Sequence, residues 1–338
     1  MPFRSSSSFL APAALSVLSR FRPGVVRGLL ALVILIGFVC VALTPAGCER
    51  AGESDQAASG AVIVSIPPLE GLVAPVLGPD HAVRVLVPSG RSVHGYRPTP
   101  KDIAALGTAQ AVVLVGLNLE TGVARAARRV PVITMADALG IAPEDEEDHS
   151  GHDHDGHDHA HGSVDPHLWL DPVLAARFVR ALPSVLPPEL VDDETAGRAE
   201  RLAAEIDAVG EAYRQRLAPF EGRPIVTHHA SFNRPAERYG LRVAAVLRAV
   251  ETLEPSAADI AKSVEAIRAE GVGAIFVEPQ FGRSSAERVA KAAGVELVTL
   301  DPLGKGDWVA TMRRNLDALV RGLEASPGTI KDASEPAP

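Results

Sequence analysis

Short runs rich in β-branched residues alternate with helical stretches along most of the 338-residue chain, and this alternation restricts the fold more than any other feature. Strands that alternate with helices favour a parallel sheet with helices on both faces. In the first half, the expected strands are Ala61–Ile66, Ala82–Val87, Ala111–Val115 and Pro131–Thr134. The helices expected among them are Leu69–Leu77, Thr99–Leu106 and Glu120–Arg129.

The second half of the chain repeats this alternation. Its expected strands are Pro224–Thr227, Leu241–Leu247, Ala274–Val277 and Glu296–Leu300. Its expected helices are Ser231–Tyr239, Ser256–Glu270, Ser284–Ala293 and Asp307–Leu323. Two such halves predict an α/β protein of two lobes, each a parallel sheet flanked by helices. We expect the N-terminal lobe over residues 61–190 and the C-terminal lobe over residues 221–326.

One long helix is expected to join the two lobes, within residues 191–220. Apolar residues recur at three- and four-residue spacing over Asp192–Leu217, and Pro219 would end the helix. A helix of this length would span about 39 Å. Because no stretch rich in Gly and Ser separates the halves, the pattern favours a rigid connector over a flexible linker.

The first 47 residues have the pattern of a secretory signal. Four Arg precede the apolar run Leu29–Leu43, which is shorter than the ~20 residues that a membrane-spanning helix needs. The following Pro45-Ala46-Gly47-Cys48 is similar to a bacterial lipobox. We therefore predict a signal peptide over residues 1–47, a lipid on Cys48, a polar tether over residues 48–60 and a disordered tail over residues 327–338. An uncleaved membrane anchor is the alternative, and both place the lobes outside the cytoplasm.

Cysteine content and charge limit the kind of site that the lobes can hold. Both cysteines, Cys40 and Cys48, precede the lobes, so any metal site there must use His, Asp or Glu. Without the four Arg of residues 1–47, the chain carries 29 basic and 42 acidic side chains, a net charge of about −13. This balance disfavours nucleic acid as a partner and mildly favours cations.

Residues 144–161 hold six of the eleven histidines together with eight carboxylates. Imidazole suits divalent zinc, copper or nickel, and carboxylates add oxygen ligands. The segment has no large apolar side chain to bury, so we interpret it as a disordered loop that collects metal. Its histidines are His149, His152, His154, His157, His159 and His161.

Three further candidate ligands, His94, His229 and Asp301, lie just past the carboxyl ends of expected strands, where open α/β sheets bind their ligands. His167 follows the metal-collecting loop. Three imidazoles and one carboxylate are a sufficient tetrahedral set for zinc. The alternatives are a surface role for a single loop histidine, as for His81, and a turn at Asp301 before Pro302.

Six segments in the same order show that the chain resembles the cluster A-I metal-binding proteins of bacterial ABC importers, in particular the zinc branch. The resemblance extends from about Ala61 to Leu323. It is carried by Ser92-Val-His94-Gly-Tyr-Arg-Pro-Thr-Pro-Lys-Asp102, Gly116-Leu-Asn-Leu-Glu120, Asp165-Pro-His-Leu-Trp-Leu-Asp-Pro172, His229-Ala-Ser-Phe-Asn-Arg-Pro-Ala-Glu-Arg-Tyr-Gly-Leu241, Phe276-Val-Glu-Pro-Gln280 and Leu300-Asp-Pro-Leu-Gly304.

The resemblance implies that His94, His167 and His229 bind the metal, with Asp301 as the fourth ligand. His229 rather than His228 matches the family's spacing. Zinc members have His at this third position and manganese members usually have Glu, so His229 favours Zn²⁺ over Mn²⁺. The residues expected to support the ligands by hydrogen bonds are Glu278 and Asp165. The stretch Asn233-Arg-Pro235 departs from the more aromatic sequence that is usual there.

The function implied is capture of Zn²⁺ and its delivery to a membrane permease, by a monomer without enzymatic activity. The ATPase would be a separate chain, because no phosphate-binding loop of the Gly-rich Lys-Ser/Thr type occurs. A manganese- or iron-binding importer component or adhesin of the same fold is the first alternative. An extracytoplasmic zinc hydrolase and a pure metal buffer are the others. Acid should release the metal, because imidazoles bind it only when deprotonated.

Overall fold

The computed structural model describes residues 60–142, 164–248 and 255–325. All of them belong to one compact unit, Ala57–Pro338. The predicted signal peptide, the lipidated Cys48, nearly all of the tether, the metal-collecting loop and the tail lie outside the described residues. No helix of the described part is both long and apolar enough to cross a membrane.

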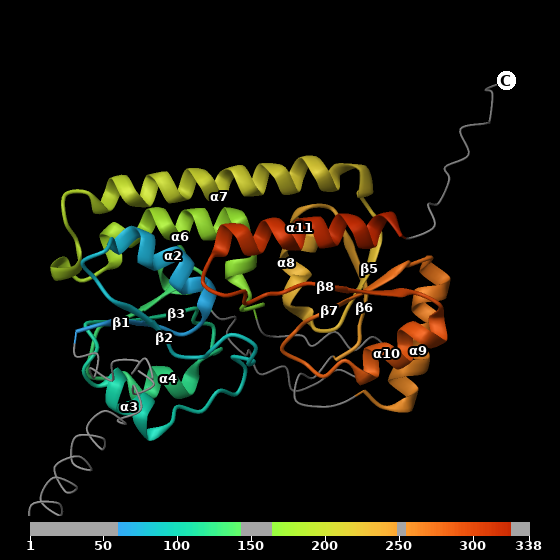
Figure 1. Ribbon diagram of the computed structural model, residues 1–338, viewed down its shortest axis with the longest axis horizontal. Helices are drawn as coiled ribbons and strands as arrows, with labels where there is room; N and C mark the ends of the chain where they lie inside the picture. Colours follow the sequence, from blue (N-terminus) through green and yellow to red (C-terminus); the bar gives the residue numbers. More distant parts are fainter. Residues whose placement is uncertain (1–59, 143–163, 249–254, 326–338) are drawn as a thin grey trace, which may run out of the picture. The chain divides into compact units, whose positions relative to one another are not determined.

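The first half forms a sheet of four parallel strands in the order β2-β1-β3-β4 (Figure 1). Helices cover both faces of this sheet, as the sequence predicts. The strands are β1 (Val62–Val64), β2 (Val83–Val85), β3 (Ala111–Leu114) and β4 (Val132–Thr134). The helices are α2 (Pro67–Leu77), α3 (Pro100–Leu106), α4 (Thr121–Ala126) and α5 (Met135–Leu139).

Alternate residues of β1 point into two different hydrophobic cores, which explains why its three residues are all apolar. Val62 and Val64 pack in the core that contains α2, whereas Ile63 packs with Leu106 and Val123 of α3 and α4. A strand that is buried on both faces has no polar side in its sequence. The continuous apolar run therefore marks a central strand of a parallel sheet.

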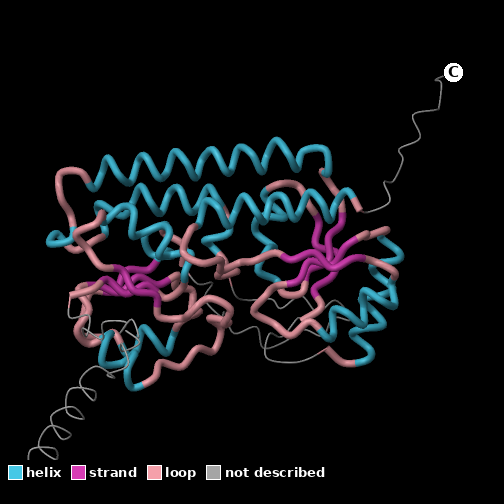
Figure 2. Tube along the Cα trace, in the orientation of Figure 1, coloured by secondary structure: helices cyan, strands magenta, loops and turns pink. Residues whose placement is uncertain are grey.

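The second half forms a second sheet of four parallel strands, in the order β6-β5-β7-β8. Its strands are β5 (Pro224–Thr227), β6 (Arg242–Val246), β7 (Ala274–Val277) and β8 (Glu296–Thr299). Its helices are α8 (Asn233–Arg238), α9 (Ala257–Glu270), α10 (Ser284–Ala293) and α11 (Trp308–Glu324). Figure 2 shows the two sheets in magenta, each with its own helices.

The long helix α7 (Thr195–Leu217) joins the two halves, as predicted, and it begins three residues later than the sequence suggests. Its buried residues belong to one hydrophobic core that also contains residues of both halves. At its C-terminal end, the hydroxyl of the fully buried Tyr213 donates a hydrogen bond of 2.8 Å to the carbonyl of Met312 in α11. The connector is therefore packed against both lobes along its length.

One long helix was not among the sequence predictions. Helix α6 (Pro172–Val185) begins at the N-cap Asp171, whose carboxylate accepts the backbone N–H groups of Val173 and Leu174. An acidic N-cap followed by Pro at the first helical position is a strong start signal. Pro183 lies inside the last turn, where a proline normally indicates the end of a helix, but this helix continues past it. The short helix α5 was also missed.

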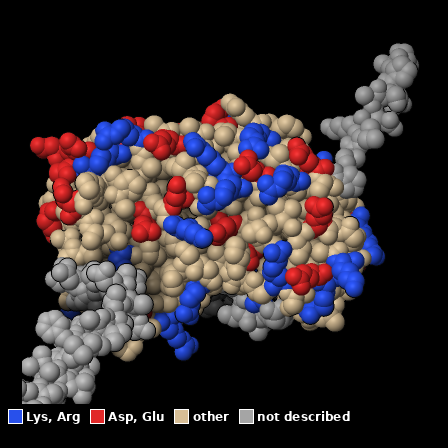
Figure 3. Space-filling model, in the orientation of Figure 1, with Lys and Arg blue, Asp and Glu red and all other residues tan. Residues whose placement is uncertain are grey.

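The charged side chains on the face seen in Figure 3 do not segregate by sign. Lys and Arg lie among Asp and Glu over this face. Exposed ion pairs among the described residues include those of Arg180 with Glu200 and Asp207. Such exposed pairs contribute only ~0–1 kcal/mol each to stability.

Candidate metal centre

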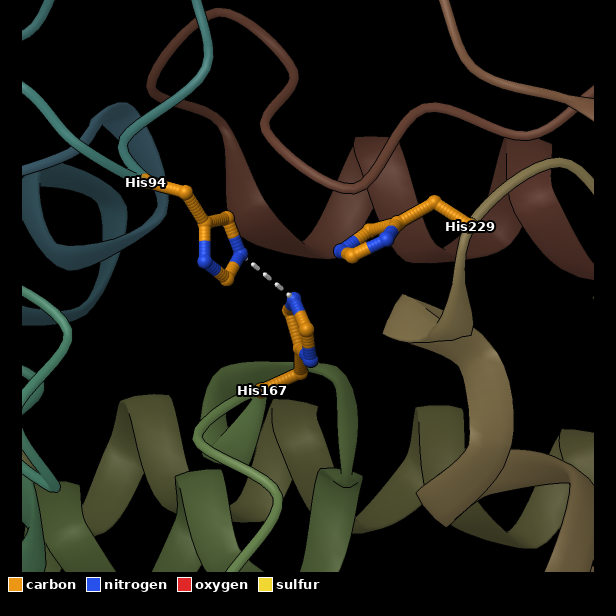
Figure 4. A group of neighbouring side chains, drawn as sticks. All are labelled: His94, His167 and His229. Atoms are coloured by element: carbon orange, nitrogen blue, oxygen red, sulfur yellow. Dashed lines mark hydrogen bonds between the residues drawn. The ribbon is translucent and has the colours of Figure 1, made fainter. Parts of the chain in front are cut away.

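Three imidazole rings converge between the two sheets, from His94, His167 and His229 (Figure 4). Each pair of ring centroids is 5.2 Å apart, and one ligand atom from each ring lies within 4.8 Å of the others. The Nε2 atoms of His94 and His167 are 3.2 Å apart. Two nitrogens at ~2.05 Å from a tetrahedral zinc ion would be about 3.3 Å apart. The observed separation of these two nitrogens is therefore compatible with a shared zinc ion.

His94 lies in the loop between β2 and α3, which is fixed by the start of α3. The Oγ atom of Ser92 accepts a hydrogen bond from the backbone N–H of His94, at 3.1 Å. Two residues after His94, the hydroxyl of Tyr96 donates to Asp102 Oδ2 at 2.8 Å. Asp102 is also the N3 residue of α3 and forms a capping box with the N-cap Thr99. The helix start therefore anchors the loop that carries the first ligand.

His167 is oriented by Asp165. The Oδ1 atom of Asp165 lies 2.7 Å from His167 Nδ1 and accepts the backbone N–H of His167 at 2.9 Å. A carboxylate on Nδ1 fixes the tautomer in which Nδ1 carries the proton, so Nε2 keeps its lone pair for a metal. Burial alone would raise the pKa of Asp165, but the hydrogen bonds from His167 and the charge of Arg234 lower it below its usual value. Asp165 therefore stays ionised in this role.

His229 is the second residue after β5 and is 8% exposed. Neither of its ring nitrogens has a hydrogen-bond partner among the described residues. Buried polar atoms are nearly always paired in native proteins, so two unpaired ring nitrogens indicate a partner of another kind. A metal ion would be such a partner.

Burial keeps two of the three imidazoles neutral. Desolvation, followed by the nearby His167, lowers the pKa of His94 from 6.5 to about 4. The same causes lower the pKa of His229 from 6.5 to about 3. At neutral pH both rings are therefore in the deprotonated form that binds metal.

The three rings line a small cavity of about 20 Å³, which is room for one water-sized sphere. The buried Glu278 also lines it and accepts a hydrogen bond from Ser231 Oγ at 2.5 Å. Gln280 lines it too, and its Oε1 atom has no hydrogen-bond partner among the described residues. The cavity thus combines three nitrogen ligands with oxygen atoms that could contact a bound ion or its water.

Asp301 does not belong to the group of converging ligand atoms in the described part of the chain. Its Oδ1 atom accepts hydrogen bonds from Gln280 Nε2 at 2.9 Å, from the Leu303 N–H at 3.1 Å and from the Gly304 N–H at 3.0 Å. The carboxylate therefore closes the turn after β8, which is the alternative that the sequence left open. Its role as a fourth ligand stays a prediction.

His228 lies beside the cluster and not in it. Its buried ring contacts the ring of Phe281 edge-on, at 5.6 Å between centroids. Neighbouring side chains on an extended backbone point in opposite directions, so only one of the two adjacent histidines can face the cavity. The structure gives this place to His229, the one that the family spacing favours.

Several residues around the site were missed by the sequence reasoning. Trp169 packs against His167, with 5.3 Å between the ring centroids. Arg234 and Arg238 contact the segment that carries His167. The sequence pattern that could have indicated these contacts is Arg234 and Arg238, one helical turn apart, together with the two aspartates that flank His167.

Comparison with known proteins agrees with the two-lobed fold. A family model described as zinc-uptake complex component A, periplasmic (ZnuA), matches residues 62–322. The zinc-binding lipoprotein AdcA of Streptococcus pneumoniae serotype 4 is 27% identical over 302 residues, which cover 85% of this chain and 60% of AdcA. The chain therefore spans less than two thirds of that relative.

Two further proteins match over most of their own length. The high-affinity zinc uptake system protein ZnuA of Bacillus subtilis strain 168 is 28% identical over 274 residues, which cover 76% of this chain and 86% of that protein. A crystal structure of ZnuA has 27% sequence identity and a TM-score of 0.65, and the match covers 78% of this chain and 99% of that one. Because the family model matches most of the chain, this protein belongs to the ZnuA family of periplasmic zinc-uptake components.

Proposed function

We propose that this protein captures Zn²⁺ outside the cytoplasm and delivers it to the permease of an ABC importer. The observation that supports this most is the convergence of His94, His167 and His229 around one small cavity. Three imidazoles, one of them oriented by a carboxylate, are a typical zinc ligand set. The zinc-binding names of the relatives AdcA and ZnuA point the same way.

The ligand chemistry favours zinc over manganese. Manganese prefers carboxylate, carbonyl and water oxygens, whereas imidazole suits zinc. All three converging side chains are imidazoles, and the carboxylate of Asp165 is engaged by His167. The fourth coordination position would face the cavity wall formed by Glu278 and Gln280. Asp301, held in its turn beside Gln280, is the other candidate for that position.

The parts outside the described residues complete the proposal. Residues 1–47 would direct export, Cys48 would carry a lipid and residues 48–60 would tether the lobes to the membrane. The loop at residues 144–161 would raise the local concentration of Zn²⁺ beside the site. The chain would act as a monomer without enzymatic activity and dock on a permease whose ATPase is a separate subunit.

The experiment that tests this function is a competitive titration of the mature protein with Zn²⁺ and Mn²⁺, with and without residues 144–161. We expect one tight zinc site to survive the deletion and Mn²⁺ to compete poorly. His229→Ala should abolish tight binding, whereas His81→Ala, which changes a histidine away from the cluster, should leave it intact. If the deletion removes all tight binding, the protein is a metal buffer and the three-histidine site is not its main site.

A further inference from the structure

The segment Asp165–Asp171, which carries His167, is bonded mainly to the C-terminal half although it precedes α7. The guanidinium of Arg234 in α8 donates to the backbone carbonyl of Asp165 from Nε at 2.9 Å and from Nη2 at 2.5 Å. One helical turn later, Arg238 Nε donates to Asp171 Oδ2 at 2.6 Å. One short helix therefore holds both ends of the segment. That helix follows the ligand His229 after a single 3₁₀ turn.

Two tryptophans hold the middle of the same segment. The indole N–H of Trp169 donates to the carbonyl of Pro302 at 2.7 Å. In the other direction, the indole N–H of Trp308 donates to the carbonyl of Trp169 at 2.8 Å. Both tryptophans are buried, so these bonds are protected from water. His167 is thus fixed to the C-terminal half on both sides.

Of the two arginines, Arg234 is the one whose contacts continue to a ligand ring through a carboxylate. Arg234 fixes the carbonyl of Asp165, and its Nε lies 3.6 Å from Asp165 Oδ2. The other oxygen of the same carboxylate, Oδ1, lies 2.7 Å from His167 Nδ1. Arg238 instead contacts Asp171, whose carboxylate caps α6. The two arginines are therefore similar in position and different in what they hold.

We propose that Arg234 is a positioning residue for zinc: it fixes Asp165 so that the His167 ring faces His229 in the right tautomer before the metal arrives. This inference rests on the proposed zinc-binding function. Preorganised ligands lower the cost of binding, because the ring does not have to be oriented when the ion enters. A positioning residue of this kind affects metal affinity through Asp165 and not through overall stability.

The test compares Arg234→Gln with the matched control Arg238→Gln in the protein lacking residues 144–161. Both changes remove an arginine of α8 that holds the same segment. Zinc affinity is measured by competition with a chromophoric chelator, and the thermal unfolding of the metal-free proteins is recorded. We expect Arg234→Gln to weaken zinc binding about tenfold, the lower end of the loss seen when a ligand's hydrogen-bonded support is removed. Arg238→Gln should change zinc affinity less than about twofold, with a similar loss of thermal stability.

Two further measurements separate positioning from a merely structural effect. In an Asp165→Ala background, Arg234→Gln should change zinc affinity by less than about twofold, because the carboxylate through which Arg234 acts on the His167 ring is already absent. NMR of the ring nitrogens should show His167 protonated on Nδ1 in the wild type and in Arg238→Gln, and a mixture of tautomers in Arg234→Gln. Arg234→Lys keeps one donor and should restore part of the affinity.

Additive effects of Arg234→Gln and Asp165→Ala, or equal zinc affinities for the two arginine variants, would overturn the inference. The same holds for an unchanged His167 tautomer in Arg234→Gln. These outcomes differ from failure of the proposed function, in which the wild type itself lacks a tight zinc site or His167→Ala retains it.

Discussion

Acid release of zinc tests the buried cluster most directly, because burial changes the pH range in which protons compete with the metal. With the ordinary pKa of about 6.5, two imidazoles at pH 5 would together weaken apparent zinc affinity about 1,000-fold relative to their deprotonated forms. Desolvation lowers the pKa of His94 to about 4 and that of His229 to about 3. With these values, the same two rings would weaken affinity at pH 5 by only about 10%.

We therefore expect a shallow dependence of zinc affinity on pH. Between pH 7 and pH 5, the logarithm of the apparent affinity should fall with a slope of at most about one, because His94 and His229 take up almost no proton in this range. Three imidazoles with the ordinary pKa of about 6.5 would instead give a slope that approaches three in this range. Steep loss from His94 and His229 should begin only near pH 4.

The assay is a competition titration at several pH values with chelators of known proton affinity. It uses the protein without residues 144–161, because the six histidines of that loop would titrate in the same range. Calorimetry at pH 6 in two buffers of different ionisation enthalpy gives the number of protons released, which should be at most about one and not about two. A slope of two or more between pH 7 and pH 5 would refute the reasoning, because it would mean that His94 and His229 are not buried neutral ligands.

Three further predictions concern single groups around the site. Asp165→Asn should lower zinc affinity by about 10- to 100-fold in the same competition assay, because the neutral amide supports the His167 tautomer less well; an unchanged affinity would contradict that role. Asp301→Asn should change zinc affinity less than about threefold, because the Asn Oδ1 can accept the same hydrogen bonds of the turn. A larger loss would support Asp301 as the fourth zinc ligand. The metal-free protein should lose stability as pH falls from about 7 to about 4, as measured by urea unfolding. The reason is that imidazoles of the unfolded chain gain protons near pH 6.5, whereas the buried rings of His94 and His229 do so only near pH 4 and pH 3. A constant free energy of unfolding over that range would argue against the lowered pKa values.

Much of the fold was predictable because its signals are local. The strands β1 and β7 read as continuous apolar runs, since parallel strands in a covered sheet are buried on both faces. The start of α3 was visible from Thr99, Pro100 and Asp102, whose hydrogen bonds span only three residues. Helix α6 was missed because Pro183 weakens its pattern, although the helix packs extensively against α7.

The candidate ligands were predictable for a similar reason. His94 and His229 follow strands of two different sheets, and parallel strands place their carboxyl ends at the same edge. His167 follows no strand. Its place after the metal-collecting loop made it a candidate, and the resemblance to the family implied that it is a ligand. Asp301 shows the limit of this reasoning. A position after a strand brings a carboxylate near the site, but the neighbouring amide donors decide what the carboxylate binds.

The amino-acid sequence by itself determined the order of strands and helices, the two-lobed architecture and the type of ligand, since periodicity, caps and side-chain chemistry act over a few neighbouring residues. Tertiary structure alone decided that three rings share one cavity, that Arg234 reaches Asp165 and that His94 and His229 stay neutral. These properties depend on distances and on exclusion of water between segments far apart in the chain. Desolvation and hydrogen-bond partners are set only when those segments pack together.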